Sequence, residues 1–131
     1  MKLESHIKKL KEHLDGLEWG IREDNHSSVG FHASQGAVEL LSILLHKLNL
    51  IQMGMQLKHN WFKSERITQE KLDFVFPEKN KILFLMKEIE EYREPLCYGS
   101  PKSEEIIQII SDKFEHLKRL IEEKTGENFD V

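Results

Sequence analysis

The residues best suited to chemistry form a polar stripe within the most apolar segment of the chain. The segment covers residues 29–51 and reads VGFHASQGAVELLSILLHKLNLI. The polar members of the segment are His32, Gln35, Glu39, Ser42 and His46, spaced at i, i+3, i+7, i+10 and i+14. In a helix this spacing places all five side chains in one narrow line. Such a stripe can form one wall of a binding cleft, a solvated strip or a polar seam between helices.

A shared metal ion is a poor explanation of the stripe. His32, Glu39 and His46 are each one heptad apart, and a heptad rises about 10 Å along a helix, too far for one coordination shell. A di-metal carboxylate bundle needs paired Glu-x-x-His turns, and the sequence contains none. We therefore predict no metal site and no cofactor.

A second wall is predicted where an apolar-faced helix over residues 78–93 stops. The sequence there reads REPLCYGSP from Arg93 onward, and its two prolines and one glycine interrupt a regular helix. The guanidinium of Arg93 is a permanent cation with a planar fork suited to phosphate. Alternatively, Arg93 pairs with Glu39 or Glu94 and caps the carbonyl groups at the helix end.

Other sequence patterns limit the kinds of reaction and ligand that the chain can support. The phosphate-binding, dinucleotide, zinc-protease and nucleophile-elbow motifs are absent, and the single cysteine, Cys97, has no context that marks a nucleophile. Aromatic and basic residues interleave over residues 58–63, which read KHNWFK. This cluster either stacks single-stranded bases or is a helix end that covers the core.

Composition points to one soluble domain covering residues 1–131. Charged residues make up 32% and hydrophobic residues 39% of the chain, and the formal net charge is -4, which gives no global basic field for nucleic acid. A lone cysteine fits a reducing compartment. The first ten residues lack the apolar core of a signal peptide, and the polar stripe would be expensive in lipid. We expect a cytoplasmic protein that does not enter the membrane.

Apolar periodicity predicts an all-α fold, an antiparallel bundle of four long helices plus a short extra helix. The long helices are expected over residues 2–22, 29–51, 78–93 and 100–124, with Gly126 ending the last. The short helix is expected over residues 68–76, with Leu72, Val75 and Phe76 facing inward. The apolar face of the last helix and the Trp61-Phe62 pair exceed the needs of one small core, which indicates a homodimer.

Two of these segments carry a resemblance to a known family. GFHASQGAVELL resembles the second helix of the HEPN superfamily, and REPLCYG stands where that family has an arginine, a polar residue, a short spacer and a histidine. The resemblance covers most of the chain in helix order. It implies a helical bundle, commonly dimeric, that is a metal-independent endoribonuclease or an inactive nucleotide- or RNA-binding relative. Many members form toxin–antitoxin pairs with a small nucleotidyltransferase.

By this resemblance Arg93 corresponds to the family arginine and Glu94 to the polar residue, whereas Tyr98 replaces the histidine. Imidazole, with an ordinary pKa near 6.5, exchanges protons at neutral pH, whereas a phenol, near 10, is a poor base there. Tyr98 then either serves as a hydrogen-bond donor or stacking ring, or ribonuclease activity is lost.

Three hypotheses follow. The first is a HEPN-like homodimer that binds a nucleotide or RNA, as one component of a toxin–antitoxin pair with a nucleotidyltransferase; its site comprises His32, Gln35, Glu39, Arg93 and Tyr98. The second is a metal-independent endoribonuclease with Arg93, Glu94 and Tyr98 as catalytic residues. The third is a structural bundle that docks a protein partner through its first or last helix.

Overall fold

The computed structural model describes residues 2–52, 54–98 and 104–130, except the side chains of Tyr98 and Glu104. The described residues form five α-helices and one short 3-10 helix, with no strand. The elements are α1 (Leu3–Arg22), α2 (His26–Lys47), η1 (His59–Lys63), α3 (Glu65–Lys71), α4 (Lys79–Tyr98) and α5 (Glu104–Thr125). The prediction of an all-α fold is confirmed.

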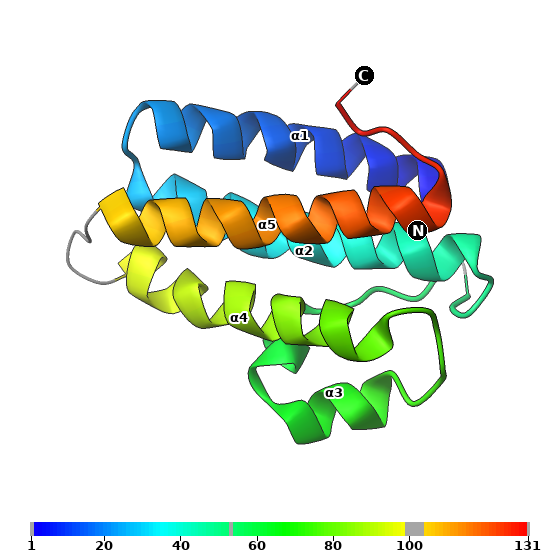
Figure 1. The fold of residues 1–131 in the computed structure, drawn as a ribbon. Coiled ribbons are helices and arrows are strands. Elements are labelled where there is room, and N and C mark those ends of the chain that lie inside the picture. The colour runs from blue at the N-terminus through cyan, green and yellow to red at the C-terminus, as the bar shows by residue number, and fades with distance from the viewer. Residues whose placement is uncertain (1, 53, 99–103, 131) are drawn as a thin grey trace.

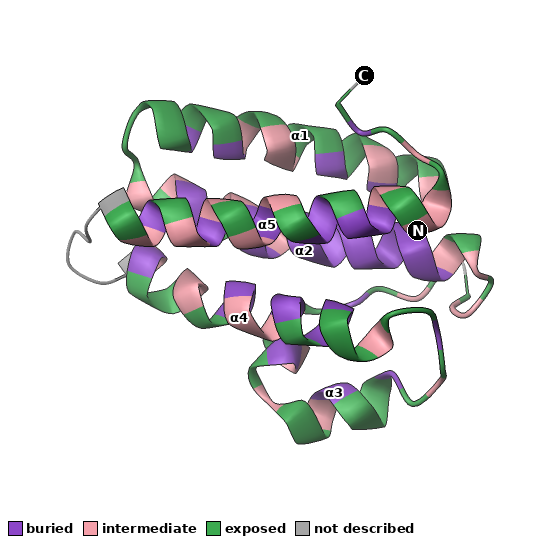
Figure 2. Ribbon diagram, viewed as in Figure 1, coloured by how far each residue is buried: buried purple, intermediate pink, exposed green. Residues whose placement is uncertain are grey.

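Helix α2 is the central element, as its apolar pattern predicts. It packs against α1, α4 and α5, and most of its length is buried (Figure 2). The side chain of Asn25 caps its start by accepting a hydrogen bond from the backbone N–H of Ser28. The helix ends at Lys47 rather than at residue 51, because the chain turns at Asn49, whose φ is 56°.

The long helices lie side by side with alternating directions (Figure 1). Helices α1 and α4 run one way along the molecule, whereas α2 and α5 run the other way, and α3 lies below α4. Among the described residues, no helix is both long enough and apolar enough to span a membrane.

Helix α4 continues beyond the break predicted at Arg93. It runs through Pro95 to Tyr98, although an internal proline removes a helical hydrogen bond and costs about 3 kcal/mol. Burial of Leu96 against α2 offsets this cost, and the hydroxyl of Ser27 donates to the carbonyl oxygen of Cys97. The predicted start of the last helix, at Ser100 and Pro101, lies outside the described residues.

The short helix also differs from its prediction. It begins after Ser64, whose side chain accepts from the N–H of Ile67, and ends at Lys71, before the predicted stretch is complete. Leu72 and Phe76 are buried as expected, whereas Val75 is 87% exposed. The inward prediction for Val75 was wrong because the chain is no longer helical at that position.

The last helix ends as predicted at Gly126, whose φ of 76° suits a residue without a side chain. Its apolar face is buried, including Ile110, Phe114, Leu117 and Ile121. The tail after it folds back, since Phe129 is also buried.

Candidate functional site

The candidate site begins with Arg93, near the end of α4. Its Nη1 atom donates to the Oγ atom of Ser34 on α2 over 3.1 Å. Its guanidinium carbon lies 5.2 Å from the ring centroid of Phe31, which is 40% exposed. A cation so placed gains from the aromatic face, and its planar group is held in one orientation. Within the described residues Arg93 pairs with neither Glu39 nor Glu94, the two partners considered from the sequence; its hydrogen-bond partner is Ser34.

A buried carboxylate, Glu90, organises the residues around Arg93. Its side chain is only 3% exposed, and its Oε1 atom accepts from the Ser34 hydroxyl over 2.7 Å. Its Oε2 atom lies 2.8 Å from Nδ1 of His59 on η1. The Ser34 hydroxyl thus donates to Glu90 and accepts from Arg93 at once. We call Ser34, His59, Glu90 and Arg93 the Glu90 network.

The network orients the ring of His59 through its Nδ1 atom. An ionised carboxylate only accepts hydrogen bonds, so the shared hydrogen belongs to Nδ1 of His59. In the neutral ring Nε2 then keeps its lone pair and can take up a proton. The His59 side chain is 29% exposed, which leaves it open to a ligand. An imidazole oriented by a carboxylate is a common acid–base arrangement.

Cys97 borders the network but is not a suitable nucleophile. Burial raises the pKa of its thiol; the charge of Glu90 also raises it, whereas Arg93 lowers it. Since the net shift is upward, the thiol is protonated at neutral pH and little reactive thiolate forms. Its Sγ atom instead contacts the carbonyl oxygen of Ser27 at 3.5 Å.

The predicted stripe faces a different helix. Nδ1 of His32 lies 3.0 Å from Nδ1 of His13, and Oε2 of Glu39 lies 2.5 Å from Nδ1 of His6, both on α1. Ser42 is buried and Gln35 is half-buried. The stripe is therefore largely a polar seam between α1 and α2, and the structure does not bring Glu39 together with Arg93.

Some polar atoms of the seam have no partner among the residues that the structure describes. The rings of His6 and His46 lie 5.0 Å apart, and within the described residues the Nε2 atoms of both, like the Ser42 hydroxyl, are buried without a hydrogen bond. Among the described residues, no group of three or more His, Cys, Asp or Glu side chains is arranged to hold a metal ion.

The two remaining predicted catalytic residues stand apart from the network. Glu94 is exposed, and its Oε2 atom lies 3.7 Å from Nζ of Lys63. An exposed ion pair at this distance contributes little. Tyr98 belongs to the last turn of α4, and its side chain lies outside the described structure.

Sequence reasoning missed Ser34, His59 and Glu90. One signal was available for Glu90, a carboxylate three residues before Arg93 and one residue after the buried Ile89. Ser34 lies inside the segment that carries the family resemblance, and His59 lies in the aromatic and basic cluster. Nothing in the sequence links these three positions, because the contacts between them join α2, η1 and α4.

Comparisons of the chain with protein-family models, with curated proteins and with solved structures give no match.

Proposed function

We propose that this chain is a HEPN-like protein that binds the phosphate of a nucleotide or of RNA through Arg93. The observation that carries the proposal is the arrangement of Arg93, held by Ser34 and lying over the exposed ring of Phe31. A guanidinium recognises phosphate oxygens with two parallel hydrogen bonds. The aromatic ring beside it offers a base a surface for stacking.

Buried Glu90 supports this proposal because it prepares the site before a ligand arrives. It fixes the Ser34 hydroxyl, which in turn holds Arg93. A side chain that is already ordered loses less conformational entropy when it binds. Lys63 adds a second cation close to this end of α4 through its contact with Glu94.

The test is the binding of single-stranded RNA and of ATP by Arg93→Ala. The matched control is Arg66→Ala, since Arg66 is an exposed arginine on α3 whose ion pair, among the described residues, is with Glu70 on the same helix. We expect Arg93→Ala to weaken binding and to reduce the slope of log affinity against log salt by about 0.7, the value for one phosphate contact on a single strand. Unchanged binding and slope in Arg93→Ala would refute the assignment.

A second candidate function, metal-independent RNA cleavage, is supported by the His59–Glu90 contact of 2.8 Å. The family position of the acid–base histidine holds Tyr98, but His59 offers an imidazole to the network that includes Arg93. Cleavage in EDTA that is lost in His59→Ala and kept in His116→Ala would support this function, since His116 is an exposed histidine on α5. Loss of cleavage in Tyr98→Phe but not in His59→Ala would instead assign the acid–base role to the tyrosine.

The proposal extends to an antiparallel four-helix bundle of the HEPN type and to a homodimer. Part of the apolar surface behind the dimer prediction is used within one chain, because Phe62 and the face of α5 are buried. Exposed Phe31 and Phe84 remain as apolar surface. Sedimentation that finds only monomer at micromolar concentration would contradict the dimer, and a pull-down would test the nucleotidyltransferase partner.

A further inference from the structure

A pocket lies between α3 and α4, apart from the Glu90 network. Its volume is about 310 Å³, near the lower end of the range for small-molecule sites. Phe62 and Leu83 line it and are almost fully buried, at 2% and 8% exposure. These side chains belong to η1 and α4, so the apolar floor is built from ordered elements.

The rim of the pocket offers chemistry that suits a flat heteroaromatic ring. Phe84 is 59% exposed and presents an aromatic surface beside the apolar floor. The side-chain amides of Gln69 and Asn80 also line the pocket. Neither amide has a hydrogen-bond partner within the part of the chain that the structure describes. Each can both donate and accept, which matches the paired donors and acceptors on the edge of a nucleobase.

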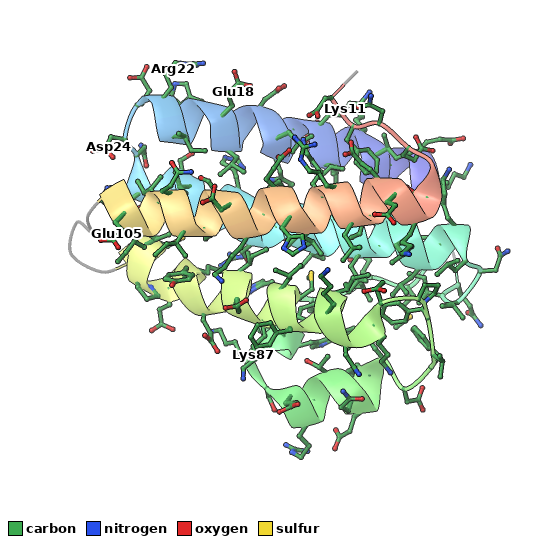
Figure 3. The ribbon with its side chains drawn as sticks, viewed as in Figure 1. Lys11, Glu18, Arg22, Asp24, Lys87 and Glu105 are labelled. Carbon is green, nitrogen blue, oxygen red and sulfur yellow. The ribbon has the colours of Figure 1, made fainter. Side chains whose placement is uncertain are left out.

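The lining also includes one cation, Lys87, and one carboxylate, Glu65. Lys87 lines the pocket, and Figure 3 shows it projecting from α4 on the side of the molecule where α3 lies. Its only ion pair within the described part of the chain is a 4.0 Å contact with Glu91 on the same helix. Such an exposed pair is weak, so the ammonium is available to a phosphate next to a bound base.

Helix η1 connects this pocket to the Glu90 network. His59, at its start, contacts Glu90, and Phe62 lies three residues later in the floor of the pocket. Three residues of a 3-10 helix rise about 6 Å, so the two sites are neighbours.

We propose that the α3–α4 pocket receives one nucleobase of the nucleotide or RNA whose phosphate Arg93 binds. This inference rests on the proposed function and adds to it a second contact point and a class of ligand. The base stacks on Phe84 and its edge bonds to Gln69 and Asn80. A purely aliphatic ligand would leave both amides and the ring unused.

The first experiment titrates the protein with adenosine, cytidine, guanosine and uridine, followed by NMR chemical shifts. Nucleosides lack phosphate, so their binding does not require the phosphate contact of Arg93, and its dependence on Phe84 separates the pocket from the ring of Phe31. We expect at least one nucleoside to bind and Phe84→Ala to weaken it by about tenfold, as expected when one stacking ring is lost. Asn80→Ala should reduce the difference between the nucleosides. The control is Trp19→Ala, which removes an exposed aromatic residue from α1.

The outcomes separate this proposal from that for Arg93. No nucleoside binding at millimolar concentration, or equal binding by Phe84→Ala, would overturn the pocket assignment. Nucleoside binding that depends on Phe84, with RNA binding unaffected by Arg93→Ala, would refute the phosphate assignment alone.

A second experiment compares nucleoside monophosphates with a single-stranded oligoribonucleotide. If Phe84→Ala weakens the binding of both, the ligand is RNA. If it weakens the binding of the monophosphate alone, the ligand is a free nucleotide. Because Phe84 is largely exposed, its loss leaves no core cavity, and circular dichroism will verify folding.

Discussion

The Nδ1 atoms of His13 on α1 and His32 on α2 lie 3.0 Å apart across the seam between the two helices. A contact this short needs one donor and one acceptor, so one ring carries its hydrogen on Nδ1 and the other presents a lone pair. Two imidazolium rings would point two N–H groups at each other. The contact therefore favours a state in which at most one of these histidines is charged.

This seam makes the fold sensitive to acid. Burial lowers the pKa of His13, the charge of His32 lowers it further, and Glu39 and Glu12 act in the opposite direction. Burial also lowers the pKa of His32 and of His46. In the unfolded chain these rings return to their ordinary pKa of 6.5. Below that pH the unfolded state binds more protons, so stability falls as the pH drops from about 6.5 toward the lowered pKa values.

Urea unfolding at about pH 7.5 and about pH 5.5 will measure this loss of stability. We expect His32→Gln to lose less stability between the two pH values, because one titrating ring is gone and its charge no longer acts on His13. His116→Gln, on the exposed face of α5, should behave like the wild type. The same loss in His32→Gln as in the wild type would contradict this assignment.

Gly30 sets how closely α2 approaches α4. A Cβ atom at this position would lie 2.8 Å from Cβ of Leu96, closer than two carbon atoms can pack. Gly30→Ala gains about 1 kcal/mol of helix propensity, but overpacking costs about 1–3 kcal/mol. We expect a net loss of up to about 2 kcal/mol in urea unfolding, together with weaker RNA binding as Arg93 moves from Ser34. Gly54→Ala, where a Cβ atom would meet no neighbour within 4 Å, is the control.

The close packing of α2 and α4 also shows which features of the fold could not be predicted from the sequence. The apolar spacing of α2 and α5 predicted both helices and their buried faces, since periodicity alone determines which side of a helix can be buried. The proline rule placed the end of α4 too early, because the packing of Leu96 near Gly30 is a long-range contact that local rules do not include.

The candidate site was predictable only in part for the same reason. The chemistry of Arg93 follows from its residue type, whereas its partner depends on which side of α2 faces α4. The stripe fits a cleft wall, a solvated strip or a polar seam equally well by its spacing, and in the structure it contacts α1, whereas Ser34 on the neighbouring side of α2 contacts Arg93. A single polar residue carries no pattern that would reveal this.

The tail is predicted to stabilise the fold through Asp130. Lys118 is 4% exposed, and its Nζ atom lies 2.6 Å from Oδ1 of Asp130 and 3.3 Å from Oε2 of Glu115. Burial disfavours the charge, but the hydrogen bond to Asp130 and the nearby carboxylates outweigh it and raise the pKa of Lys118. This contribution is complete below the ordinary pKa of 10.5 and is lost as the pH rises through the folded value.

We expect Asp130→Asn to lose about 0.5–1 kcal/mol of stability at neutral pH, because the amide oxygen can still accept from Nζ of Lys118 whereas the carboxylate charge, itself 63% exposed, is lost. Urea unfolding will measure the change, with Asp15→Asn, an exposed carboxylate on α1, as the control. Equal stability of the two variants would mean that the charge of Asp130 contributes nothing measurable to the stability of the fold.

Glu90→Gln tests whether the buried carboxylate positions Arg93. The Ser34 hydroxyl and Nδ1–H of His59 both donate to Glu90, but an amide has only one accepting oxygen, so one donor would face the NH₂ group. We expect a loss of about 1–3 kcal/mol in stability from the unmatched donor. Glu91→Gln, which changes an exposed carboxylate on the same helix, should lose less than about 0.5 kcal/mol.

The effect of Glu90→Gln on RNA binding distinguishes two roles. Removal of a negative charge close to Arg93 would by itself strengthen the attraction of RNA. Disorder of Ser34 would instead release Arg93 and weaken binding. We expect weaker binding, measured at several salt concentrations, because Arg93 depends on the Ser34 hydroxyl for its orientation. Tighter binding by Glu90→Gln would mean that Glu90 acts on the ligand only through its charge and that Arg93 needs no support from the network.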